Sequence, residues 1–484
     1  MDHDIEDSAD AATRALSRAA AHASAYLAAL DRTSVSPTLS SAEVRASLDS
    51  ELPEEGLPPD KVIEDLVAAA EGGLIGSAGG RFFGWVMGGA LPSALAADWL
   101  TSVWDQNAAL HASGPAAAIV EEVVGRWAKE LIGLPPEASF ALTTGCQMAH
   151  VTCLAAARHH LLAARGWDVE ARGLSGAPPI SLLASDAVHG SIERAMRLLG
   201  MGTDRLVRVG ADGQGALPAE GLAAALEALE GAPAIVLLQA GDINRGAFDD
   251  FARLVPIARG AGAWIHVDGA FGLWAAAAPS RRHLVRGVAL ADSWATDAHK
   301  WLNVPYDSGL AFVRQAGAHR AALSHRAAYL VHAEESRDQI DWSPEWSRRA
   351  RGFAVYAALR ELGRAGVADL IERTCAHTEA LVEGLERIPE VEVLARPVIN
   401  QALVRFPDPA AGAGDAEHDR RTDAVIDAIV TDGEAFFGGT LSNGVRAMRI
   451  SVCNWRTTEE DVRRAVAAVE RALASVGPSS AQAL

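Results

Sequence analysis

The stretch SWATDAHKWLNVPYD, residues 293–307, ends an apolar run with a lysine, Lys300, that stands between a histidine and a tryptophan. A lone lysine after a strand is most often a surface residue. Two other ionisable residues end apolar runs in the same way, since Asp268 closes AWIHVD and His189 follows ISLLASDAV. Ligands of parallel sheets bind beyond the carboxyl ends of the strands. The three residues together therefore predict a single site.

The pattern around these residues predicts an α/β fold with a mostly parallel, seven-stranded sheet in the large domain. Short apolar runs alternate with amphipathic segments such as GLAAALEALEG and FARLVPIARGAG, as expected for strands buried on both faces by crossover helices. The expected strands are SFALTTG (139–145), ISLLASDAVHG (180–190), RLVRVG (205–210), AIVLLQAG (234–241), AWIHVDGA (263–270), ADSWATDAHK (291–300) and GLAFVR (309–314).

The rest of the chain suggests two smaller units around this domain. Helical spacing at 11–30 and 61–71 predicts an N-terminal helical arm over residues 1–80, and a long helix-prone tract runs from LPSALAADWL to VGRWAKELIGL. The large domain then covers 81–360, and 361–484 form a small α+β domain. In that domain RAMRISVCN is β-like, a final helix opens at Thr457 or Thr458, and the insert AAGAGDAEHDR (410–420) is expected to be an exposed loop.

Charge and cysteine content exclude several classes of partner. The formal charge of −19 argues against nucleic acid and anionic membranes, which require clustered Lys and Arg. No apolar stretch is long enough to cross a bilayer, and the acidic start MDHDIEDSAD is unlike a signal peptide. The four cysteines show neither CxxC nor finger spacing, so we expect reduced thiols in the cytoplasm and no metal site.

The three strand-end residues have the properties needed to use pyridoxal phosphate (PLP). A lysine amine can condense with an aldehyde, a carboxylate can keep a pyridine nitrogen protonated, and an imidazole can stack on the ring and carry protons. The turn Thr143–Thr144–Gly145–Cys146 leads from a strand into a helix, and this geometry directs backbone N–H groups at an anion such as phosphate.

The motifs HVDGAFG (266–272), ADSWATDAHKWLNVPYDSG (291–309) and SDAVHGSIERA (185–195) resemble those of the group II PLP-dependent amino-acid decarboxylases. This family includes aromatic-amino-acid, histidine and glutamate decarboxylases, and the likeness covers roughly residues 75–460. It implies PLP fold type I, which is aspartate-aminotransferase-like, and a homodimer with active sites at the subunit interface. The helical arm then suits a dimer clasp.

The resemblance also assigns roles to individual residues. Lys300 corresponds to the Schiff-base lysine, Asp268 to the partner of the pyridine nitrogen, and His189 to the imidazole stacked on the ring. Ala270 corresponds to the small residue against the opposite face of the ring. The residues that fall where the family contacts the cofactor phosphate are Gly145, Cys146, Gln147, Asp297 and His299.

Several positions depart from the family pattern. Gln147 and Met148 stand where relatives usually have a small hydroxyl residue followed by an acidic one, and Ile243 stands where many have a threonine. Relatives that decarboxylate aromatic amino acids have a mobile-loop tyrosine that is thought to protonate the carbanion. No tyrosine lies between Val331 and Arg348 here, and Tyr329 lies upstream.

We therefore expect PLP-dependent decarboxylation of a small-molecule substrate, an L-amino acid, to its amine and CO₂. Phe82, Trp85 and Trp104 fall in the segment that lines the family's substrate pocket, which favours an aromatic or apolar side chain. Arg81 leaves an acidic amino acid open, and Arg449 could meet a carboxylate or cap a helix. The sequence also leaves three other functions open. The protein could be an O₂-consuming aldehyde synthase, a transaminase or a PLP-binding scaffold without catalysis.

Overall fold

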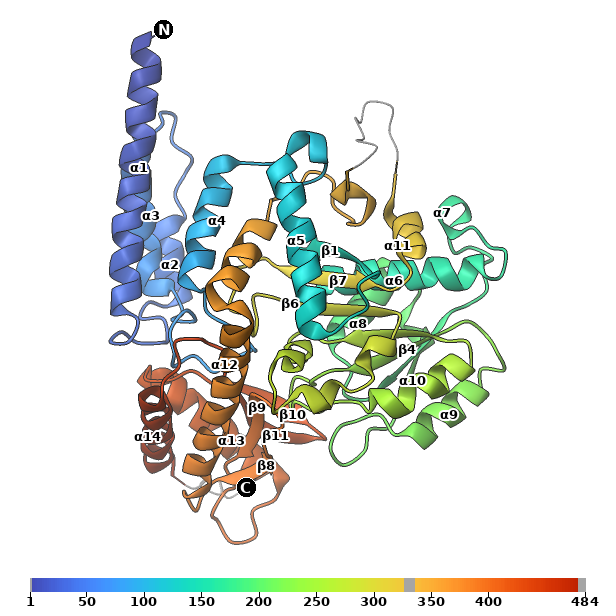
Figure 1. Cartoon of the computed structure of the whole chain (residues 1–484). Helices are drawn as coiled ribbons and strands as arrows, with labels where there is room; N and C mark the ends of the chain where they lie inside the picture. The colour runs from blue at the N-terminus through green and yellow to red at the C-terminus, as the bar shows by residue number, and fades with distance from the viewer. Residues whose placement is uncertain (1, 326–335, 478–484) are drawn as a thin grey trace.

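A seven-stranded sheet forms the centre of the larger lobe in the computed structural model, which describes residues 2–325 and 336–477 (Figure 1). The strand order is β1-β7-β6-β5-β4-β2-β3. Among the described strands of this sheet, only β7 runs antiparallel to its neighbours, so the expected mostly parallel sheet is confirmed. The strands coincide with the seven expected runs: β1 (Ser139–Thr143), β2 (Ser181–Ser185), β3 (Leu206–Val209), β4 (Ala234–Gln239), β5 (Trp264–Asp268), β6 (Ser293–Asp297) and β7 (Gly309–Val313).

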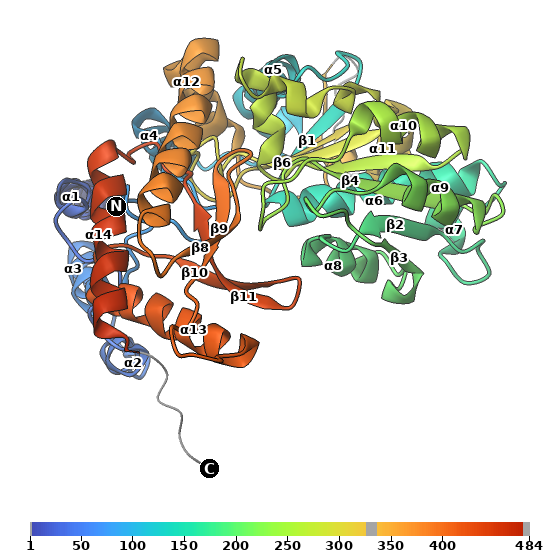
Figure 2. The same cartoon turned by 90° about the horizontal axis from the view of Figure 1, so that it is seen from below.

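Helices cover both faces of this sheet, which explains why its central strands are continuously apolar (Figure 2). One face packs against α6 (Cys146–Ala163), α8 (Gly190–Leu198) and α11 (Ala316–Leu323). The other face packs against α5 (Pro115–Ile132), α9 (Ala219–Glu227) and α10 (Phe251–Gly260). Successive residues of one strand enter different cores, because Leu237 belongs to the α6 side and Leu238 to the α10 side.

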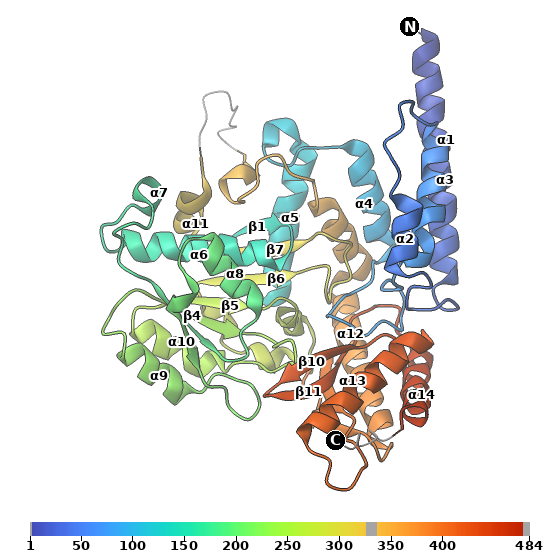
Figure 3. The same ribbon diagram turned by 180° about the vertical axis from the view of Figure 1, so that it is seen from behind.

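The smaller lobe is built on an antiparallel sheet with the strand order β10-β11-β9-β8 (Figure 3). Its strands are β8 (Glu392–Ala395), β9 (Gln401–Arg405), β10 (Gly438–Ser442) and β11 (Val445–Ser451). The helices α13 (Asp415–Asp432) and α14 (Glu459–Ser475) pack on the sheet around a core that includes Val404, Ile429 and Val469. Thr458 caps α14 through a hydrogen bond from the Asp461 N–H, which confirms the predicted start of this helix.

Helix α12 (Gly352–Glu386) connects the two lobes. Its first part packs against α5 and α4 (Pro92–Trp104), whereas Leu381 and Leu385 belong to the core of the smaller lobe. Gly363 interrupts the helix with φ of 60° and ψ of −175°, a conformation that a residue with a side chain adopts only under strain. The chain thus changes direction at this glycine as it passes from one lobe to the other.

The N-terminal segment consists of α1 (Asp2–Ala29), α2 (Ser41–Leu48) and α3 (Pro59–Ala70), with α1 packed along α3. These helices lie at the side of the molecule next to α4 and the smaller lobe (Figures 1 and 3). In the part of the chain that the structure describes, no helix combines the length and the apolar character required to cross a membrane.

Three local expectations differ from the structure. Residues 415–420 of the expected loop form the start of α13, because Glu417 accepts a hydrogen bond from the Gly414 N–H and Val425 and Ile426 follow as a buried face. The helix-prone tract is broken between α4 and α5, at Gly114 and Pro115. The sequence patterns also give no sign of α2 and β10, both of which are largely exposed and carry a weak apolar pattern.

Candidate active site

A cavity of about 440 Å³ lies where several strands of the large sheet end. Asp268 and Asp297 are the last residues of β5 and β6, and β2 and β4 lead into loops that also reach this cavity. It is lined by Cys146, Gln147, His150, His189, Gly190, Ser191, Arg194, Gln239, Gly241, Asp242, Ile243, Asp268, Ala270, Phe271, Asp297 and Lys300. The three ionisable residues that the sequence singled out therefore line one cavity.

Asp268 is a buried carboxylate surrounded by positive or polar groups. Its Oδ1 accepts a hydrogen bond from the Ala270 N–H at 3.1 Å. Burial by itself would raise the pKa of Asp268, but His150, His189, Lys300 and the Ala270 N–H outweigh it and lower this pKa. The carboxylate is thus ionised and suited to bind a cationic or N–H group.

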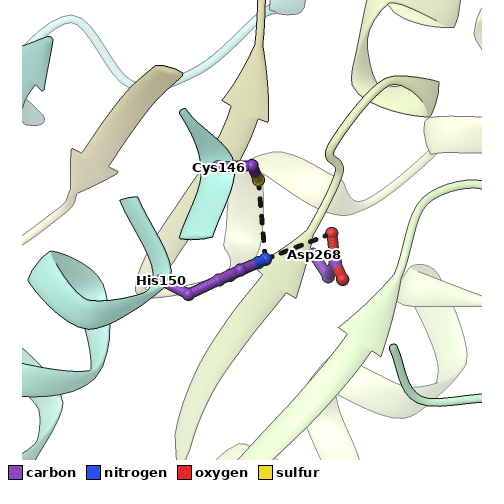
Figure 4. Close-up of side chains that lie close together, drawn as sticks. All are labelled: Cys146, His150 and Asp268. Atoms are coloured by element: carbon purple, nitrogen blue, oxygen red, sulfur yellow. Dashed lines mark hydrogen bonds and ion pairs between the residues drawn. The ribbon is translucent and has the colours of Figure 1, made fainter. Parts of the chain in front are cut away.

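His150 and Cys146, both on α6, lie directly beside Asp268 (Figure 4). The Nε2 atom of His150 is 3.6 Å from Asp268 Oδ1 and 3.5 Å from Cys146 Sγ. The three groups could share a metal ion, since their ligand atoms all lie within 4.8 Å of one another. Burial, together with Asp268 and Asp297, raises the pKa of Cys146 well above its ordinary value. The thiol therefore stays protonated, whereas metal ligation uses the thiolate.

His189 is held at the start of α8, where it is the N-cap residue. Its Nδ1 accepts a hydrogen bond from the Ser191 N–H at 3.2 Å and lies 2.8 Å from Ser191 Oγ. The proton of the neutral ring is therefore on Nε2. Desolvation by the protein packed around the ring lowers the pKa of His189, so this imidazole is neutral near pH 7.

Lys300 lies in the turn after β6, with its Nζ 5.7 Å from the centre of the Phe271 ring. The backbone of this turn is packed against residues 88–91. The N–H of Gly88 donates to the His299 carbonyl at 3.2 Å, and the N–H of Leu91 donates to the Asn303 carbonyl at 2.9 Å. Main-chain hydrogen bonds thus fix the lysine's position.

The turn between β1 and α6 forms a second part of the site. Gly145 has a φ of 102°, and the N–H of Cys146 donates to Asp297 Oδ2 at 2.8 Å. His299 Nδ1 lies 3.1 Å from Asp297 Oδ1, but neither atom has a hydrogen bond. Gln147 lines the cavity and donates from Nε2 to the Ser191 carbonyl at 3.1 Å. The N-terminus of α6 and the imidazole of His299 therefore meet at Asp297, and His299 Nδ1 is left without a hydrogen bond.

The aromatic residues expected around a substrate lie outside this cavity wall. Phe82 is buried and stacks on Phe436, with ring centres 4.8 Å apart. Trp85 is 51% exposed, and Trp104 is 46% exposed with its ring edge-on to Phe353. None of the three lines the cavity formed by the described residues, and their contact with a substrate stays a prediction.

Arg81 is also engaged elsewhere, which removes it as a partner for a substrate carboxylate. Its guanidinium donates to the carbonyls of Leu30, Thr33 and Glu434. Arg449 remains available for such a role, since it is buried and its Nε lacks a hydrogen bond. Its positive charge also acts on His189. Tyr329 lies outside the described residues.

Sequence reasoning missed His150, Arg194 and Asp242 among the cavity residues. His150 stands four residues after Cys146, and this spacing puts both on one face of a helix. Arg194 is four residues into α8, whose first residue follows His189. Asp242 accepts hydrogen bonds from the N–H groups of Asn244, Arg245 and Ala247, so it also holds the loop after β4.

Comparisons with known proteins agree with this geometry. Residues 42–407 match the family model described as "Pyridoxal-dependent decarboxylase conserved domain". An L-2,4-diaminobutyrate decarboxylase from Rhizobium meliloti (strain 1021) is 28% identical over 384 residues, or 78% of this chain and 74% of that relative. An aromatic-L-amino-acid decarboxylase from Bacillus atrophaeus is 24% identical over 435 residues, or 88% of each chain.

A solved structure shows the same fold. The crystal structure of Oryza sativa TDC with PLP and tryptamine superposes with a TM-score of 0.90 at 22% sequence identity. The superposition covers 96% of this chain and 98% of that chain, so it includes both lobes and the N-terminal segment.

Proposed function

Because the chain belongs to the family of pyridoxal-dependent decarboxylases, we propose that Lys300, Asp268 and His189 are its catalytic residues and that its substrate is an L-amino acid with an aromatic or otherwise apolar side chain. Family membership makes the chain a PLP-dependent amino-acid decarboxylase with the type I fold of PLP enzymes. One observation supports the assignment of these catalytic residues: the three side chains stand at or just after the ends of three different strands and line the same cavity.

The residues present fit PLP. Lys300 would bind its aldehyde, Asp268 its pyridine nitrogen and Ala270 one face of its ring. At the N-terminus of α6, Asp297 accepts from the Cys146 N–H, so the phosphate would be held by the remaining groups there, Gly145, Gln147 and His299, whose Nδ1 is buried without a hydrogen bond. When bound, PLP withdraws electrons from the bond that breaks at the α-carbon of the substrate.

The chain's own groups would then orient the substrate and move protons. The ionised Asp268 would keep a proton on the ring nitrogen. Its negative charge stabilises the protonated nitrogen more than an uncharged side chain would. Neutral His189, with its proton on Nε2, can hold the ring and exchange a proton near the α-carbon. Lys300 can take a proton when the substrate amine replaces it and return it at product release.

Arg449 is our candidate for binding the substrate's α-carboxylate. It lies on β11 of the smaller lobe, is buried, and has an Nε without a hydrogen bond. The smaller lobe contacts the large one near the cavity, since Thr440 Oγ1 donates to Asn244 Oδ1 at 3.0 Å. A charge-assisted bond from Arg449 would hold the carboxylate that leaves as CO₂.

The apolar part of the cavity wall supports the proposed substrate class. Ile243 and Phe271 line the cavity, and Ile243 offers a methyl group where many relatives have a hydroxyl. Aromatic and aliphatic walls of this kind bind apolar side chains.

An acidic amino acid is the second candidate, and one observation favours it. Arg194 lines the cavity from α8, where its guanidinium could pair with a side-chain carboxylate. A screen of amino acids by CO₂ release and product mass tests both candidates. Release from aromatic or apolar amino acids supports the first, release from glutamate or aspartate supports the second, and release from neither class refutes both.

The same screen should record O₂ uptake, because aldehyde formation is the competing outcome of the same site. We expect one CO₂ and one amine for each substrate consumed, without O₂ uptake. An aldehyde product with stoichiometric O₂ uptake would replace the amine-forming assignment with the aldehyde synthase, and an oxo acid as product would indicate transamination.

We further propose a cytoplasmic homodimer in which residues 1–80 clasp the partner subunit, with 81–360 and 361–484 as the large and small domains. Apolar side chains on α4 support this assembly, since Val103 is 59% and Trp104 46% exposed. The four cysteines are free and buried, as expected in a reducing compartment. Light scattering should give twice the chain mass, and Val103→Asp should shift it toward the mass of one chain.

A further inference from the structure

A buried row of polar side chains lies behind Asp268, on the side of α6. His150, His266, Ser293 and Trp264 belong to α6, β5, β6 and β5, and each is at most 2% exposed. Trp264 Nε1 donates to Ser293 Oγ at 2.9 Å, and Ser293 Oγ lies 3.0 Å from His266 Nδ1. His266 Nε2 lies 2.9 Å from His150 Nδ1, and His150 Nε2 faces Asp268 Oδ1 at 3.6 Å.

One direction of hydrogen bonding satisfies both ends of this row, the donor Trp264 and the carboxylate of Asp268. The indole N–H of Trp264 can only donate, so Ser293 accepts there and its own hydroxyl proton is free for His266 Nδ1. The proton of His266 is then on Nε2 and is donated to His150 Nδ1. This leaves the proton of His150 on Nε2, which lies 3.6 Å from Asp268 Oδ1 and 3.5 Å from Cys146 Sγ.

The row is electrically neutral and oriented. Burial lowers the pKa of His150, and burial together with His150 lowers the pKa of His266 to about 3. Near pH 7 both rings are therefore neutral, and His266 directs its proton at His150, which in turn directs its own toward Asp268. The other groups facing this carboxylate are Lys300 from the turn after β6, His189 from α8 and Cys146 from α6.

We propose that His150 is a positioning residue: supported by His266, Ser293 and Trp264, it holds the carboxylate of Asp268 in one orientation and ionised toward the cofactor nitrogen. Oδ1 accepts a hydrogen bond from the Ala270 N–H and lies 3.6 Å from His150 Nε2, so Oδ2 is left for the cofactor. The inference rests on the proposed role of Asp268. Chains of aligned hydrogen bonds strengthen one another in a dry interior.

The test uses the purified enzyme with PLP and follows the visible absorbance of the bound cofactor against pH, together with the affinity for added PLP. A proton on the ring nitrogen makes the nitrogen joining Lys300 to the cofactor more acidic. In His150→Leu, Asp268 should hold the proton on the ring nitrogen less well. The pH midpoint of the absorbance change, which reports the loss of the proton from the nitrogen joining Lys300 to the cofactor, should then rise by about one pH unit or more. His150→Gln keeps a donor near the Nε2 position and should restore most of the shift.

His319→Leu is the matched control, because His319 is equally buried but belongs to α11. It contacts Ser139 Oγ at 2.8 Å and the Trp342 carbonyl at 2.9 Å, away from the cavity residues. This variant should lose thermal stability and keep the wild-type midpoint and PLP affinity. An equal shift of the pH midpoint in His150→Leu and His319→Leu would overturn the inference. The shift would then follow from replacing any buried histidine by leucine.

A wild-type midpoint and PLP affinity in His150→Leu would also overturn it. Where His150→Leu does not fold, Ser293→Ala decides, because it interrupts the row two hydrogen bonds upstream and should raise the midpoint in the same direction. A wild-type protein that shows no visible absorbance with PLP refutes the proposed function itself, and the inference with it.

Discussion

A single methyl group added at Gly88 should displace Lys300, the proposed catalytic lysine. A Cβ at this position would lie 2.0 Å from the Lys300 carbonyl oxygen, whereas ordinary contacts begin at 3.4 Å, so one backbone must move by about 1.4 Å. Gly88 has no positive φ, so the alanine itself fits the local conformation. The whole effect of Gly88→Ala is therefore expected to come from this contact.

Neither backbone can move without losing hydrogen bonds. The Gly88 N–H donates to the His299 carbonyl at 3.2 Å, and the Gly89 N–H donates to Asn303 Oδ1 at 2.7 Å. A reacting group misplaced by about 1 Å costs about 10²-fold in rate. We expect kcat/KM of Gly88→Ala for CO₂ release to fall by about this factor, while the protein remains folded.

The assay combines CO₂-release kinetics, the cofactor's visible absorbance and thermal unfolding. Gly317→Ala is the control, because an added Cβ on α11 meets no atom within 4 Å and should leave all three measurements near wild type. An unchanged kcat/KM in Gly88→Ala, with normal absorbance, would refute the reasoning. It would mean that residues 84–89 give way and that the close contact does not fix Lys300.

Three further predictions concern other parts of the molecule. Lys300→Ala should abolish the visible absorbance of the bound cofactor, and an unchanged spectrum would remove this lysine from its role. Arg449→Gln should raise KM about 10- to 100-fold through loss of a charge-assisted hydrogen bond, whereas an unchanged KM would place the carboxylate elsewhere. Burial raises the pKa of Asp249 from 3.8 to about 6, so the protonated form of this carboxyl group stabilises the folded state relative to the unfolded state. The resulting stability is complete below pH 4 and is lost as the pH rises through 6, which amounts to about 3 kcal/mol. Chemical unfolding from pH 3.5 to 7 should show this loss in the wild type and a flatter profile in Asp249→Asn, and equal profiles would contradict the assignment.

The large sheet could be predicted from sequence because its strands are buried on both faces. Such strands give uninterrupted apolar runs, and an ionisable residue at the end of one, such as Asp268, stands out. The residues that line the cavity from helices do not stand out in this way. His150 and Arg194 lie in segments where polar residues are common, and only the packing of α6 and α8 directs them to the cavity.

Contacts between distant parts of the chain explain the other differences. The ring of Phe82 stacks on Phe436, a contact that no local pattern of the sequence indicates. Arg81 likewise binds Glu434 and carbonyls of the N-terminal segment. Glycines such as Gly88 are equally uninformative alone, because their need for space depends on which backbone lies opposite.

Asp297 has a consequence for how the protein matures. Its carboxylate already occupies the first N–H of α6, at the place where an external anion would otherwise complete the helix. A newly made polypeptide can therefore finish this part of its structure from its own atoms, before any vitamin B6 derivative arrives.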